Sequence, residues 1–123
     1  MSATHPRLAL LAAVATIAAA GCGSTTTVGD RHTFSVALSE YRVTPQDVHA
    51  TAGETAIYVH NYGRLTHDLV LTFEGQMWAT TKPIAPGEGT ELTTALIPGR
   101  YEMASSLLSD QALGAYGTLD VSR

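Results

Sequence analysis

From residue 32 onward, hydrophobic and polar residues alternate along short stretches that are separated by turn residues. A predicted strand over 33–38 places Phe34, Val36 and Leu38 on one face. This period of two is typical of half-buried strands. Neither a helical period nor an internal repeat is found, so the pattern predicts an all-β sandwich of about eight strands. The other predicted strands cover 48–51, 55–61, 67–73, 77–81, 90–96, 101–105 and 117–121.

Histidine 67 stands out because the alternation places it on an inner face. In the strand predicted over 67–73, His67 shares its side with Leu69 and Leu71. A buried imidazole needs hydrogen-bond partners or a metal ion. We therefore treat His67 as the candidate centre of any functional site, and expect His32, His49 and His60 to be ordinary surface residues.

The N-terminal part has the features of an export signal. Residues 8–20 carry no charge and are rich in Ala and Leu, and "AAGC" follows, ending at Cys22. A short apolar segment of this kind is typical of a signal peptide, and the "AAGC" sequence resembles a bacterial lipobox. Cys22 is also the only cysteine of the chain. The alternative is a plain secretory signal that leaves a free exported thiol.

These features predict three regions and an extracytoplasmic location. A lipidated Cys22 would anchor the protein to a bacterial membrane, within the cell envelope. The segment "GSTTTVGD" is small and polar, as linkers are. The net formal charge of −4 gives no basic surplus for binding nucleic acid. The predicted regions are a lipoprotein signal peptide over 1–21, the lipidated cysteine and a flexible tether over 22–31, and the folded domain over 32–123.

Two long stretches resemble the halves of a small cupredoxin, of the plastocyanin and sulfocyanin type. They are "EYRVTPQDVHATAGETAIYVHNYGRLTHDLVL" and "IAPGEGTELTTALIPGRYEMASSLLSDQALGAYGTLDV". The resemblance extends from Phe34 to Val121 and implies a cupredoxin-like Greek-key β-sandwich. Members of that family generally hold one copper ion with two His, one Cys and a distant Met, and transfer single electrons.

The resemblance also implies where the copper ligands would stand. The first His corresponds to His67, the Cys to Ser105, the second His to Asp110 and the Met to Ala115. A serine hydroxyl is a hard neutral ligand and cannot replace the thiolate of a blue copper site. We therefore expect a degenerate member of the family that has no type 1 copper site and no cofactor.

Three interpretations of the remaining polar residues are open. In the first, Asp110 and Ser105 form a hydrogen-bonded cluster around His67 in place of the metal. In the second, His67 and Asp110 bind copper, or Zn(II), in a non-blue site that serves copper handling or, less readily, electron transfer. In the third, Ser105, His67 and Asp110 act as a hydrolytic set. The third is the least favoured, because the sequence has neither a nucleophile elbow nor a recognisable oxyanion hole.

The favoured function is that of a non-enzymatic module in the cell envelope, either structural or binding a protein partner. Apolar residues in the loops at the ligand end could form a docking surface. The residues expected there are Tyr62, Leu65, Leu107, Leu108 and Tyr116.

Overall fold

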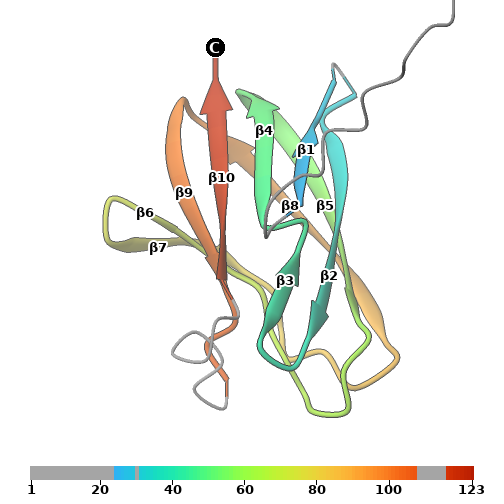
Figure 1. Ribbon diagram of the computed structural model, residues 1–123. Coiled ribbons are helices and arrows are strands. Elements are labelled where there is room, and N and C mark those ends of the chain that lie inside the picture. Colours follow the sequence, from blue (N-terminus) through green and yellow to red (C-terminus); the bar gives the residue numbers. More distant parts are fainter. Residues whose placement is uncertain (1–23, 30, 108–115) are drawn as a thin grey trace, which may run out of the picture.

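The structure is a computed structural model that describes residues 24–29, 31–107 and 116–123, and all structural statements concern these residues. It contains ten strands in two sheets (Figure 1). Within the described part of the chain, no helix is long and apolar enough to cross a membrane. Several residues named above lie outside the described residues: Cys22, Leu108, Asp110 and Ala115.

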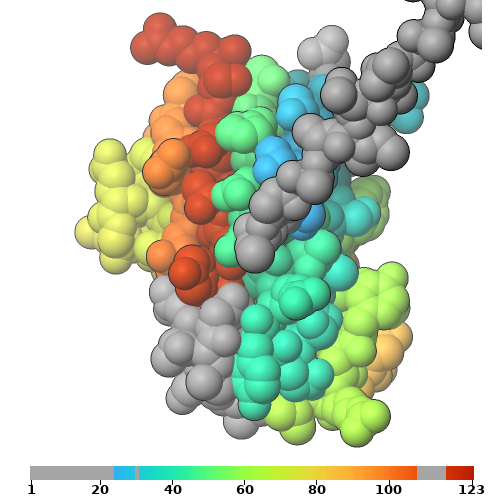
Figure 2. Space-filling model, in the orientation of Figure 1, coloured from blue at the N-terminus to red at the C-terminus, as the bar shows by residue number. Residues whose placement is uncertain are grey.

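The larger sheet has six strands in the order β1-β4-β10-β9-β6-β7. Strand β4 pairs in parallel with both β1 and β10, and the remaining neighbours are antiparallel. Figure 2 shows β4, β10 and β9 side by side on one outer face. The bounds are β1 Thr25–Thr27, β4 Asp47–Thr51, β6 Val70–Phe73, β7 Gln76–Thr80, β9 Gly99–Ala104 and β10 Tyr116–Ser122.

The smaller sheet has four strands in the order β3-β2-β5-β8. Strands β2 and β5 run parallel, whereas β3 and β8 pair antiparallel with their neighbours. The bounds are β2 Thr33–Ser39, β3 Arg42–Thr44, β5 Gly53–Asn61 and β8 Gly89–Leu96. Two sheets of mixed direction with crossover connections confirm the predicted sandwich class.

The core lies between the sheets and is built from the alternate residues that the sequence pattern identified. Phe34, Val36 and Leu38 of β2 are buried, as are Tyr101 and Met103 of β9. Burial of such side chains is the main stabilising contribution of a sandwich core. The pattern therefore assigned the inner faces of these strands correctly.

Two short strands were not predicted. Strand β1 lies within the segment 22–31 that we expected to be a flexible tether, and Val28 directly after it is buried and bonded through its N–H to the His49 carbonyl at 2.7 Å. All three residues of β1 are exposed, so alternation could not mark it. Strand β3 covers three residues and ends directly before Pro45. Such short strands carry too few residues for a period to be recognised.

Candidate functional site

The candidate site lies at one end of the sandwich, the lower end in Figure 1. The β2–β3 turn, the connection from β5 to β6 and the segment after β9 meet there. Glu40, His67 and Ser105 belong to these three segments, respectively. Residues that are far apart in the sequence are therefore brought to one place by the two-sheet arrangement.

His67 is completely buried, as its place in the pattern predicted. Strand β6 begins at Val70 rather than at 67, because His67 forms an isolated bridge with Ile84 instead of a continuous ladder. The His67 N–H donates to the Ile84 carbonyl at 3.2 Å, and the Ile84 N–H donates to the His67 carbonyl at 2.7 Å. The backbone of His67 is thus fixed by the connection between β7 and β8.

Glu40 is the partner of the His67 ring among the described residues. Its Oε1 lies 3.4 Å from His67 Nε2 and accepts the backbone N–H groups of Arg64 at 2.5 Å and Leu65 at 2.7 Å. Several hydrogen bonds lower the pKa of Glu40 from 4.5 to about 2, and the bond from the Leu65 N–H contributes most to this shift. The carboxylate is therefore ionised, and it ties the His67 ring to the loop before it.

The sequence did not indicate Glu40, because a single glutamate in a turn is typical of a solvent-exposed residue. A signal was present at Gly63, where a Cβ would come within 2.5 Å of Glu40 Oε1. The loop can approach the carboxylate closely because residue 63 has no side chain. That requirement is visible only once the two segments are known to meet.

Asp68, next to His67, is the second carboxylate at this end and, unlike Glu40, is buried. Its Oδ1 accepts the Ser106 N–H at 2.6 Å and the Ser105 hydroxyl at 3.2 Å, and its Oδ2 accepts the Ser106 hydroxyl at 2.5 Å. The Asp68 N–H in turn donates to Ser105 Oγ at 3.3 Å. Asp68 therefore joins the segment before β6 to the segment after β9.

This arrangement differs from the predicted cluster. We expected the Ser105 hydroxyl to pair with the His67 ring, but its hydrogen bonds run to Asp68. The physical reason is that the Asp68 carboxyl offers two acceptor oxygens beside the segment after β9, where it binds both Ser105 and Ser106. The predicted contact between His67 and Asp110 involves a residue outside the described part of the chain.

Asn61 positions the loop that carries His67. The amide is completely buried, and its Nδ2 donates to the carbonyls of Leu65 and Ile84, each at 2.8 Å. Its Oδ1 accepts the Gly63 N–H, also at 2.8 Å. Both hydrogens and the carbonyl oxygen of the amide are therefore used, which gives the loop a single arrangement.

The expected docking residues that the structure describes do not all line one hollow. Tyr62 and Leu65 are exposed in the connection after β5, and Leu107 is half-buried. Tyr116 is also exposed, but it lines a hollow on the six-stranded sheet, whereas Tyr62 lines a groove on the four-stranded sheet. Leu108 lies outside the described residues, and docking at this end stays a prediction.

Among the described residues, the donor atoms at this end do not fit a type 1 copper ion. The described positions provide one imidazole, carboxylates and serine hydroxyls, and the position expected for the thiolate is Ser105. Among the described residues, no three His, Cys, Asp or Glu side chains are grouped as a metal ion would require. A blue copper centre depends on a thiolate, which this donor set lacks.

The fold and this loop arrangement define a cupredoxin-like protein, and comparison with known proteins agrees. The profile of the Cupredoxin-like domain family matches residues 8–115, so the chain belongs to this family. No curated protein sequence matches the chain.

Solved structures of blue copper proteins share the fold. An auracyanin from Roseiflexus castenholzii, reduced with dithionite, is 19% identical, has a TM-score of 0.68 and is matched over 77% of this chain and 100% of its own. Auracyanin A, a "blue" copper protein from Chloroflexus aurantiacus, is 16% identical, with a TM-score of 0.64 and coverage of 78% and 99%. Reduced rusticyanin is 17% identical, with a TM-score of 0.63 and coverage of 79% and 84%. At these identities the likeness concerns the fold, and the function has to be argued from the site.

Proposed function

We propose that this protein is a membrane-anchored, cupredoxin-like lipoprotein without a type 1 copper site, acting as a non-enzymatic binding or structural module in the cell envelope. The observation that carries the proposal is the serine at the thiolate position. Ser105 is buried and hydrogen-bonded to Asp68 on both its donor and acceptor sides. The one cysteine of the chain, Cys22, precedes the sandwich in the sequence.

The hydrogen bonds also support a role outside catalysis. A serine nucleophile needs a base within hydrogen-bond reach of its hydroxyl. Here the Ser105 hydroxyl donates to Asp68, while the Nε2 of His67 lies beside Glu40. The serine hydroxyl and the imidazole thus each bind a different carboxylate and not one another. The described contacts therefore give the hydrolytic interpretation no support.

Copper titration of the purified full-length chain tests the loss of the type 1 site. We expect no intense visible band on addition of Cu(II), because no thiolate can reach the metal from the sandwich. An intense blue band would contradict the proposal. Tight one-to-one binding without that band would favour the competing non-blue copper site at His67 and Asp110.

Two variants identify any copper that does bind. His67→Gln should abolish binding at a non-blue centre, whereas His49→Gln alters an exposed histidine and serves as the control. Circular dichroism of His67→Gln is needed beside the titration, because His67 is fully buried. An equal loss of copper binding in both variants would indicate adventitious binding at the surface. It would leave the proposed absence of a type 1 site intact.

The lipid anchor is tested separately at Cys22. The parent chain should partition into the detergent phase of a Triton X-114 extraction after expression in a bacterial host, and Cys22→Ser should move to the aqueous phase. Detergent partitioning that survives the substitution would refute the anchor.

Partner binding is tested at Leu65, which is 46% exposed at the site end. Leu65→Asp should abolish cross-links to envelope proteins if this end docks a partner, because a carboxylate disrupts an apolar interface. Met77→Asp is the matched control, since Met77 is 67% exposed on β7, which lies away from the site end (Figure 1). Cross-links that persist in Leu65→Asp would contradict docking at this end and favour a structural role.

A further inference from the structure

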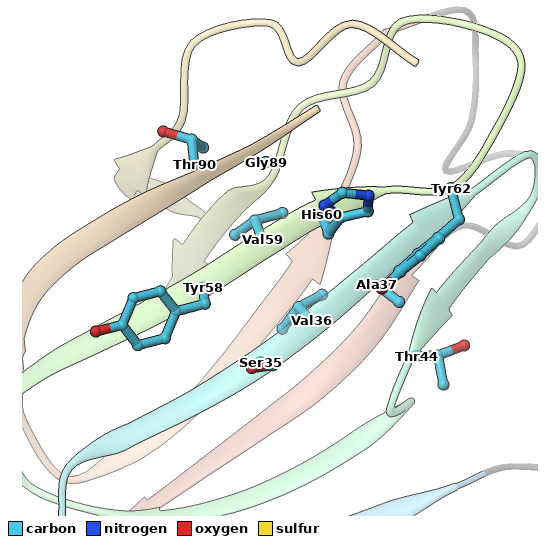
Figure 3. A pocket seen from close by; sticks show the side chains of 10 residues that line it. All are labelled: Ser35, Val36, Ala37, Thr44, Tyr58, Val59, His60, Tyr62, Gly89 and Thr90. Carbon is cyan, nitrogen blue, oxygen red and sulfur yellow. The ribbon is translucent and has the colours of Figure 1, made fainter. Parts of the chain in front are cut away.

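A groove lies on the outer face of the four-stranded sheet, apart from the buried polar residues of the site. Alternation along β5 turns Ile57 and Val59 inward and leaves Tyr58 and His60 facing outward. Tyr62 continues this alternation beyond the end of the strand, because its N–H donates to the Leu38 carbonyl of β2 at 2.8 Å. Three aromatic side chains therefore stand along one line of the sheet (Figure 3).

Small residues form the floor of the groove between these rings. Ser35 and Ala37 of β2 pair directly with Tyr58 and His60 of β5, and Gly89 of β8 pairs with His60 on the other side. The resulting space measures about 480 Å³. This volume falls within the about 300–1,000 Å³ that is usual for sites of small ligands.

Two of the three rings, those of His60 and Tyr62, have packing contacts. A Cβ at Gly89 would lie 3.0 Å from His60 Nδ1, so the imidazole occupies the space that a side chain at 89 would need. The His60 and Tyr62 rings are 4.2 Å apart between centroids and inclined at 48°. A ligand would therefore meet a largely preformed surface, which lowers the entropy cost of binding.

The chemistry of the lining selects a neutral ligand that is both apolar and hydroxylated. Tyr58 and Tyr62 are 48% and 70% exposed, so their ring faces are open to a ligand. Ser35, Thr44 and Thr90 place hydroxyl groups around these rings. None of the groove's lining residues, all within the described part of the chain, is Asp, Glu, Lys or Arg.

We propose that this groove binds a neutral saccharide, with a pyranose ring stacked on Tyr58 or Tyr62. The C–H face of a pyranose is attracted by the negative face of an aromatic ring, while its hydroxyls can pair with the surrounding serine and threonine. A charged ligand would lose hydration without an ion pair from the lining residues, and a purely apolar ligand would leave the hydroxyl groups without partners. This inference stands apart from the proposed function, because it uses no residue of the buried polar cluster.

Saturation-transfer difference NMR on the full-length chain tests the proposal. The probes are cellohexaose, maltohexaose and mannohexaose, and the protein is kept in a zwitterionic detergent because glycosidic detergents would compete. We expect transfer to at least one probe, strongest at the C–H groups of one pyranose face. Tyr58→Ala should weaken binding about tenfold, given the usual strength of aromatic contacts. Tyr41→Ala is the matched control, because Tyr41 is 53% exposed and lies outside the groove.

The outcomes separate clearly. Transfer that is lost in Tyr58→Ala and kept in Tyr41→Ala supports the proposal. No transfer to any of the three neutral probes overturns it, as does transfer that is left unchanged by both Tyr58→Ala and Tyr62→Ala. Ala37→Trp provides a second check that requires no loss of an aromatic side chain, because the added ring should fill the floor and block binding. Leu65→Asp should leave saccharide binding intact, so a failure of partner docking can be told from a failure of this groove.

Discussion

Replacing Asn61 by alanine measures how strongly the site end of the sandwich depends on one buried amide. The substitution removes two hydrogen bonds from Nδ2 and one to Oδ1, each 2.8 Å long. At about 1 kcal/mol net for each bond, we expect Asn61→Ala to lower the free energy of unfolding by about 3 kcal/mol. The Ile84 carbonyl keeps the His67 N–H as a partner, at 3.2 Å, so it is not left unpaired.

Urea denaturation followed by circular dichroism is the appropriate assay, because a small single domain usually unfolds in one step. With a slope of about 2 kcal/mol/M, a loss of about 3 kcal/mol moves the midpoint down by about 1.5 M. Thr93→Ala is the control for a surface hydrogen bond, since Thr93 is exposed and its hydroxyl donates to Glu91 at 3.0 Å. We expect that variant to stay within about 0.5 kcal/mol of the parent.

Asn61→Asp separates the donors from the acceptor. Aspartate keeps an oxygen for the Gly63 N–H but loses both donors and brings a carboxylate against the carbonyls of Leu65 and Ile84. Its cost should therefore equal or exceed that of alanine at neutral pH. A midpoint for Asn61→Ala within about 0.3 M of the parent would refute the argument, because at the usual slope it corresponds to less than one hydrogen bond.

Three further substitutions test other parts of the fold. Hydrogen bonding lowers the pKa of Glu40 from 4.5 to about 2. The stabilisation that ionised Glu40 provides is therefore complete above pH 4.5 and is lost as the pH falls toward 2. When urea midpoints are plotted against pH, Glu40→Gln should flatten the curve in this pH range. Gly99→Ala should cost about 1–3 kcal/mol in urea denaturation, because Gly99 has a φ of +144° and an added Cβ would lie 2.6 Å from the Phe73 ring. Tyr101→Phe should cost about 1–2 kcal/mol in the same assay, because the hydroxyl accepts the Ile97 N–H and donates to the Ile97 carbonyl, both at 2.9 Å. For Gly99→Ala and for Tyr101→Phe, a urea midpoint equal to the parent's would contradict the reasoning.

The fold could be predicted because the core strands carry a period of two that is long enough to be recognised. Strands β2 and β5 alternate over seven and nine residues, and their buried faces were assigned correctly from the sequence. Strand β1 could not be found, because an exposed edge strand needs no apolar residue and its three threonines are also typical of a linker. Its place is set by backbone pairing with β4, which is a tertiary property.

The candidate site was predictable in its centre but not in its partners. Parity alone marked His67 as buried, because its neighbours Leu69 and Leu71 are apolar. Glu40 is 27 positions away along the chain, and no local pattern connects it to the imidazole. Asp68 was overlooked for a different reason. Its neighbour His67 faces the core, so alternation places Asp68 on the outer face. In the structure Asp68 is buried, because the segment after β9 covers it.

The described contacts join the loops at this end of the sandwich through hydrogen bonds between protein groups. In a copper protein the metal cross-links the loops that supply its ligands. Here Glu40 binds the backbone before His67, Asn61 joins that loop to Ile84, and Asp68 binds the residues after β9. Among the residues that the structure describes, every buried polar side-chain atom has a hydrogen-bond partner. Each of the three links is made by a side chain with fixed geometry, so the loops are held by hydrogen bonds of the kind that usually specify a single arrangement. These links are the physical basis of the proposed binding module, and Asn61→Ala should therefore disturb the loops at this end as well as the stability of the domain.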